Sequence, residues 1–149
     1  MDQTLIDGPN SEFYRAYIAS TPNKQHHIIT FRSHSWAKDI WEELNRCGLN
    51  SQRLIKSIRN CPDIIHDSFM VDQHNREHGR ELDTLLWIIQ RGLTDDQFMK
   101  HVEDFPFWKG KTCHEIGATI LVDDKPELVI PGCEKYEIAF LDALEDMHS

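Results

Sequence analysis

Short apolar runs alternate along this chain with stretches of helical periodicity. Residues 27–31 (His-Ile-Ile-Thr-Phe) and 118–122 (Ala-Thr-Ile-Leu-Val) are short and mostly apolar, which favours buried strands. Two helices are predicted by apolar residues at helical spacing: Phe13, Tyr14, Tyr17 and Ile18 in the first, and Trp36, Ile40 and Leu44 in the second, which Gly48 would end. Alternating strands and helices are typical of an α/β domain.

The middle of the chain, residues 50–107, reads as mostly helical. One short helix broken by Pro62 is predicted by Leu54, Ile55 and Ile58, whereas residues 64–71 fit either a strand or an irregular connection. The buried face of another helix, stopping near Gly92, is predicted by Leu82, Leu85, Leu86 and Ile89. Residues 94–97 (Thr-Asp-Asp-Gln) match a capping box and predict the start of a further helix.

Two adjacent carboxylates, Asp123 and Asp124, follow the apolar run at residues 118–122. Neighbouring anions repel unless a cation lies between them. In open α/β sheets, ligands gather outside the carboxyl ends of the strands, and carboxylate oxygens suit Mg²⁺. The pattern therefore indicates a Mg²⁺ site, and the alternative is a solvated turn over residues 123–126.

Helices are predicted on both sides of this run. A second capping-box match at residues 112–115 predicts a short helix that begins at Lys111 and leads through Gly117 into the strand. Apolar residues at helical spacing between positions 136 and 147 predict a final helix.

The composition limits the classes of partner. The length of 149 residues suits a single domain. With 16 Lys and Arg against 25 Asp and Glu, the formal charge is −9, which argues against direct nucleic-acid binding and against binding to an anionic membrane. The four cysteines form no Cys-x-x-Cys pair, no secretory leader opens the chain, and no apolar stretch is long enough to span a membrane. A soluble, cytoplasmic protein is expected.

Four segments, in order, resemble the motifs of the haloacid dehalogenase superfamily of phosphohydrolases. Residues 1–7 (Met-Asp-Gln-Thr-Leu-Ile-Asp) resemble the second half of its opening Asp-x-Asp-x-Thr motif. The run that ends at Thr30 resembles the second motif, Lys111 stands where the family's lysine precedes the last motif, and Asp123-Asp124 resembles that last motif. The resemblance spans nearly the whole chain except residues 50–107.

The resemblance implies a single domain over residues 1–149, with a three-layer Rossmann-like parallel sheet, helices on both faces, and residues 50–107 as a small helical insertion or partial cap. It implies Mg²⁺-dependent hydrolysis of a small phosphomonoester, such as a nucleotide. Asp2 would be the general acid and base. Thr30 and Lys111 would hold the phosphate, Lys111 with a catalytic role as well, and Asp123 and Asp124 would hold Mg²⁺.

The chain departs from the family pattern at its first residue. The nucleophilic Asp of the family would fall one position before Met1, and the strand that carries it in the family is absent from the sequence. Asp7 lies too far along an extended chain to replace it. Without that strand its neighbours would lack hydrogen-bond partners, and strand swapping or a homodimer would compensate. A noncatalytic binding or regulatory protein is therefore the alternative.

Histidine patterns offer two further alternatives. Residues 74–78 match His-x-x-Glu-His, an inverted zinc-protease signature, although a solvated helix face explains the pattern equally. His34, His66-Asp67 and Asp124 loosely follow the ligand order of the His/Asp metal-dependent hydrolases, but Pro62 makes the segment before His66 a poor helix.

Overall fold

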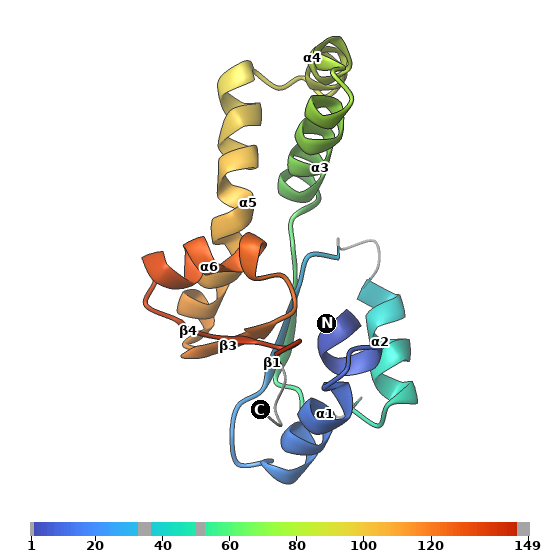
Figure 1. Cartoon of the computed structure of the whole chain (residues 1–149), viewed down its shortest axis with the longest axis vertical. Coiled ribbons are helices and arrows are strands. Elements are labelled where there is room, and N and C mark those ends of the chain that lie inside the picture. The colour runs from blue at the N-terminus through green and yellow to red at the C-terminus, as the bar shows by residue number, and fades with distance from the viewer. Residues whose placement is uncertain (1, 33–36, 50–52, 146–149) are drawn as a thin grey trace.

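A computed structural model of the chain describes residues 2–32, 37–49 and 53–145, with the side chains of Asp2, Ala37 and Lys38 outside the description. Short strands alternate with helices along it (Figure 1). In chain order the elements are η1 (Asp2–Ile6, a π-helical turn), α1 (Ser11–Ser20), β1 (His27–Thr30), α2 (Ala37–Arg46), β2 (Ser57–Asn60), α3 (Asp63–Glu77), α4 (Glu81–Gln90), α5 (Asp95–Ile116), β3 (Ile120–Asp123), α6 (Pro126–Lys135) and β4 (Ala139–Asp142).

The described strands form two separate parallel pairs. β1 pairs with β2 from His27↔Ser57 to Thr30↔Asn60, and β3 pairs with β4 from Ile120↔Ala139 to Asp123↔Asp142. Parallel neighbours need a crossover connection, and α2 and α6 supply the two crossovers. The predicted α/β class is confirmed. The predicted three-layer arrangement around one parallel sheet is not seen, because the described residues contain two two-stranded sheets instead.

Two hydrophobic clusters hold the helices to the strands. Ile28 of β1 packs in one cluster with residues of η1, α1 and α2, and Val122 of β3 packs against it. Ile29 of β1 and Leu121 of β3 pack in the other cluster with residues of α5 and α6. Neighbouring strand residues point to opposite faces, so each of these strands contributes to both clusters. Figure 1 shows α5 and α6 on one side of the strands and α1 and α2 on the other.

The helices α5 and α6 touch along their backbones. A Cβ atom added to Gly110 would lie 2.2 Å from the backbone carbon of Gly132, which no side chain could tolerate. Glycine at both positions therefore permits this close crossing.

A helical arm, made of α3, α4 and residues 95–104 of α5, extends away from the strands (Figure 1). The helix predicted from its leucine stripe exists as α4, but the prediction that the stripe is buried is wrong. Leu82 is 67% exposed and Ile89 is 63% exposed, and Ile88 is the buried residue of this helix. The periodicity identified a helix whose apolar side no described element covers.

Several other local predictions need correction. The short helix expected around residues 54–58 is instead a turn followed by β2, because pairing with β1 supplies hydrogen bonds that local spacing does not reveal. The undecided residues 64–71 lie in α3, and the helical part of the middle segment accordingly starts at Asp63. The expected final helix is β4, since its four residues pair with β3.

The remaining elements follow the predictions. The first two predicted helices are confirmed as α1 and α2, and the strands predicted in residues 27–31 and 118–122 are confirmed as β1 and β3. Trp36 lies outside the described residues. Thr94 and Gln97 form the predicted capping box at the start of α5. Of the helices in the described ranges, none combines the length and the apolar character needed to cross a membrane.

Candidate functional site

A cavity of about 860 Å³ opens at the carboxyl ends of β1 and β3, and we call it the charged cavity. Thr30, the last residue of β1, and Asp123, the last residue of β3, both line it. Its acidic lining residues are Asp39, Glu42, Glu43, Asp63, Asp67, Asp123 and Asp124, and its basic ones are Arg32, Arg46, Lys109 and Lys125. Segments far apart in the sequence thus bring charged groups of both signs to one place.

A buried ion pair between Lys109 and Asp123 lies in the wall of this cavity. Lys109 Nζ is 2.5 Å from Asp123 Oδ2, and each side chain is only 3% exposed. Asp123 Oδ1 also accepts a hydrogen bond of 2.9 Å from the backbone N–H of Lys125. The ammonium lies 4.2 Å from the centre of the Phe31 ring, a favourable cation–π distance. Buried charges are tolerated when they are paired in this way.

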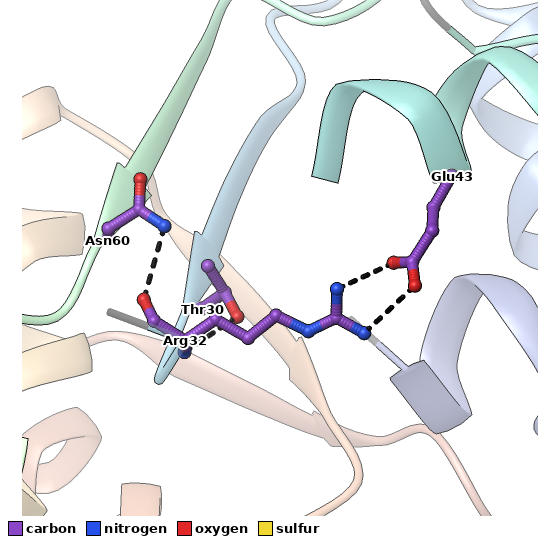
Figure 2. Close-up of polar contacts among 4 residues, drawn as sticks. All are labelled: Thr30, Arg32, Glu43 and Asn60. Atoms are coloured by element: carbon purple, nitrogen blue, oxygen red, sulfur yellow. Dashed lines mark hydrogen bonds and ion pairs between the residues drawn. The ribbon is translucent and has the colours of Figure 1, made fainter. Parts of the chain in front are cut away.

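A polar network surrounds Thr30 and Arg32 at the carboxyl end of β1 (Figure 2). The backbone N–H of Arg32 donates to Thr30 Oγ1 at 3.1 Å, and the side chain of Asn60 donates to the carbonyl oxygen of Arg32 at 3.1 Å. The Arg32 guanidinium contacts both carboxylate oxygens of Glu43, at 2.7 and 3.3 Å. This bidentate pair joins Arg32 to α2. Thr30 is 3% exposed, and its hydroxyl, which accepts from Arg32, also has a hydrogen that it can donate.

Asp124 lies beside Asp123 and also lines the cavity. Thr4 of η1 donates to Asp124 Oδ1 across 3.5 Å, which brings the start of the described chain to the end of β3. Two adjacent carboxylates fit Mg²⁺, because this ion keeps several waters and takes one or two carboxylates with phosphate oxygens. The described residues contain no group of three or more His, Cys, Asp or Glu side chains arranged to hold a metal, as an all-protein zinc site would require.

The structure brings together three of the five residues predicted for the site: Thr30, Asp123 and Asp124. Asp2 opens η1 with its backbone, and its side chain lies outside the described residues. Lys111 is exposed on α5 and is not among the described residues that line the charged cavity, which Lys109 lines instead.

The sequence contains a signal that points to Lys109. Phe105, Lys109 and Cys113 are spaced by four residues on one face of α5, and all three are buried. A lysine on an apolar helical stripe is a candidate for a buried, paired charge. The prediction of a new helix beginning at Lys111 is wrong, since α5 continues from Asp95 to Ile116 and ends at Gly117 with φ of 76°. Because the helix was predicted to begin at Lys111, the spacing of Phe105, Lys109 and Cys113 along one helix was not recognised.

Within the described residues, neither of the two histidine patterns forms a group of three side chains that could hold a metal. His74 lies on α3 and His78 directly follows that helix, with ring centres 4.3 Å apart, but within the described residues they are not part of a group of three ligand residues. His66 lines the charged cavity and its Nδ1 lies 3.0 Å from Asp67 Oδ1. His34 lies outside the described residues.

Comparison of the chain with protein-family models, curated proteins and solved structures found no match.

Proposed function

We propose that the charged cavity binds Mg²⁺ together with a small phosphomonoester, on a scaffold of the haloacid dehalogenase type. The observation that carries this proposal is the Lys109–Asp123 ion pair beside Thr30, at the carboxyl ends of two strands that come from different sheets. An ammonium and a hydroxyl are donors for phosphate oxygens, and adjacent carboxylates are ligands for Mg²⁺.

Each residue of the site has a proposed role. The ammonium of Lys109 and the hydroxyl of Thr30 hold the phosphate oxygens, with Lys109 taking the role that the sequence assigned to Lys111. Asp123 and Asp124 hold Mg²⁺, which neutralises phosphate charge when it is bound. Asp2 stays the proposed general acid and base. The finer fold that goes with this function is a three-layer arrangement in which β4-β3 and β1-β2 are two halves of one layer.

The first candidate function is hydrolysis of the bound phosphomonoester. Hydrolysis through an aspartyl intermediate needs a carboxylate nucleophile, and the family places it one position before Met1. A noncatalytic binding role is therefore the second candidate, and the same samples distinguish the two.

The test is calorimetric titration of Mg²⁺ and inorganic phosphate into four proteins: the wild type, Asp124→Asn, Lys109→Gln and Lys111→Gln. Removing one Mg²⁺ ligand is expected to weaken Mg²⁺ binding about tenfold or more. Lys109→Gln is expected to abolish phosphate binding, whereas Lys111→Gln changes an exposed lysine two positions away and serves as the matched control.

Three results would overturn the proposal: no Mg²⁺ binding at millimolar concentration, an unchanged affinity in Asp124→Asn, or equal losses of phosphate binding in Lys109→Gln and Lys111→Gln. Circular dichroism of each variant checks that it is folded. Release of p-nitrophenol from p-nitrophenyl phosphate by the wild type would favour the enzyme over the noncatalytic role.

A further inference from the structure

Two helices line the charged cavity with mainly acidic faces. On each helix the lining residues follow the spacing i, i+3, i+4 and i+7: Asp39, Glu42, Glu43 and Arg46 on α2, and Asp63, His66, Asp67 and Met70 on α3. Residues with this spacing share one side of a helix. Five of the seven acidic residues that the structure places in the lining belong to these two faces. The two helices therefore bring negative charge to the cavity.

The donors proposed for phosphate lie elsewhere in the lining, at the carboxyl end of β1 and on α5. Thr30 is buried, and its hydroxyl oxygen accepts a hydrogen bond from the backbone N–H of Arg32. Within the described ranges, no residue accepts the hydrogen of this hydroxyl. Buried polar groups normally have partners, so an oxygen atom of a ligand is a suitable acceptor. The cavity thus combines a place for an anion with two acidic helix faces.

Two carboxylates on the α2 face are available to a ligand. Asp39 and Glu42 are exposed, and neither has a hydrogen-bond or ion-pair partner among the described residues. By contrast, Glu43 on the same face is paired with Arg32. Asp39 and Glu42 can therefore bind a cation that a ligand brings into the cavity.

The Arg32–Glu43 ion pair limits the distance between Thr30 and the α2 face. Arg32 lies two positions after Thr30, and its guanidinium is 2.7 Å from the carboxylate of Glu43. Asp39 lies about one helical turn before Glu43, and Glu42 directly precedes it. One arginine side chain therefore spans the space from the end of β1 to the α2 face, and a ligand only a few bonds long could contact both.

The volume and the charges of the cavity select the kind of ligand. Its volume of about 860 Å³ is in the range of small-molecule sites. Carboxylates beside a phosphate site repel a second phosphate and attract an ammonium group. An uncharged apolar group would displace water from Asp39 and Glu42 without replacing its hydrogen bonds. A phosphate ester with a positive charge on its alcohol part therefore matches the cavity best.

We propose that the phosphomonoester of the charged cavity is zwitterionic: its alcohol part carries an ammonium or quaternary ammonium group a few bonds from the phosphate, and Asp39 and Glu42 bind that cation. This inference rests on the proposed function, because it names the substrate class of the same site. The phosphate contacts Thr30 and Lys109 with or without the cation. Neutralising Asp39 and Glu42 therefore removes the preference for a cationic ester without weakening the binding of inorganic phosphate.

The test compares phosphocholine with 3,3-dimethylbutyl phosphate, a neutral analogue of the same shape in which carbon replaces the quaternary nitrogen. Both esters and inorganic phosphate are titrated calorimetrically, with Mg²⁺ present, into the wild type and Asp39→Asn/Glu42→Gln. The matched control is Glu81→Gln/Asp83→Asn, which removes two exposed carboxylates from α4. An ester that is hydrolysed is compared by kcat/KM instead. Circular dichroism checks that each variant is folded.

The wild type and the control variant are expected to prefer phosphocholine about tenfold, the combined effect of two partly exposed ion pairs. Asp39→Asn/Glu42→Gln is expected to bind the two esters about equally and to bind inorganic phosphate at least as well as the wild type.

Equal affinities of the wild type for the two esters would overturn this inference, and so would a preference that persists in Asp39→Asn/Glu42→Gln or disappears in the control. Binding of inorganic phosphate in those samples would leave the proposed function standing. If neither ester nor inorganic phosphate binds to the wild type, the proposed function and this inference both fail.

Discussion

The helical arm differs from the rest of the molecule, which contains the strands and which we call the body, in how far its apolar side chains are buried. In the body, Ile40 and Leu44 of α2 are completely buried, whereas Leu82 and Ile89 of α4 in the arm are more than half exposed. Both sets have helical spacing. The difference teaches that periodicity specifies a helix and its apolar side, while burial depends on whether another element packs against that side.

Phe105 lies where the arm joins the body, and its loss is expected to have the largest effect. Its ring is completely buried and stacks between Phe31 at 4.4 Å and Phe69 at 4.1 Å. We expect Phe105→Ala to lower the free energy of unfolding by about 4 kcal/mol, the usual cost of a large core cavity. Urea denaturation measures this. Leu82→Ala, in the exposed part of the arm, is the matched control and should cost about 0.5 kcal/mol or less; similar losses would contradict the distinction between the regions.

The Lys109–Asp123 pair gives the next largest expected effect, within the body. Lys109→Met leaves a buried carboxylate without its cation, and we expect about 3 kcal/mol of destabilisation by chemical denaturation. The double variant Lys109→Met/Asp123→Leu removes both charges and should recover most of that loss. Lys111→Met is the exposed control. A double variant no more stable than Lys109→Met would show that the charge imbalance is not the cause.

A smaller, pH-dependent effect is expected at His27, at the start of β1. Burial lowers the pKa of His27 below 6.5, and the nearby charges of Arg59, Lys56 and His26 lower it further. The unfolded chain therefore binds a proton first as the pH falls below 6.5, so stability present above that pH is lost on acidification.

His27→Gln removes this contribution. Between pH 8 and pH 5, the wild type is expected to lose more stability in urea than His27→Gln, and the effects of the other ionisable groups cancel in the difference. Equal losses, or a larger loss in His27→Gln, would contradict the assigned direction of the pKa shift.

Strands with consecutive apolar residues could be predicted from the sequence, whereas strands that form only by pairing with a neighbour could not. β1 and β3 contain consecutive Ile, Leu or Val residues, which carry the signal by themselves. β2 reads Ser-Ile-Arg-Asn and becomes a strand through its ladder with β1. The Ala-Phe-Leu-Asp of β4 fits both helical and strand spacing, so pairing with β3 decided it.

The candidate site was predictable where it lies at strand ends. Thr30 and Asp123 follow directly from the rule that ligands gather at the carboxyl ends of strands. Lys109 comes from a long helix, and its placement depends on which face of α5 is turned toward β3. Lys111 was chosen by its place in the order of the family's motifs, whereas the lysine that lines the charged cavity in the structure is Lys109.

The crossing at Gly110 and Gly132 has a consequence for the charged cavity. Gly110 follows Lys109 on α5, and Gly132 belongs to α6, the helix that β3 leads into after Asp123. The contact of the two backbones therefore sets the separation between the helix that carries the ammonium and the strand that carries its carboxylate. The pairing of the Lys109 ammonium with the Asp123 carboxylate therefore depends on two positions, Gly110 and Gly132, that have no side chain.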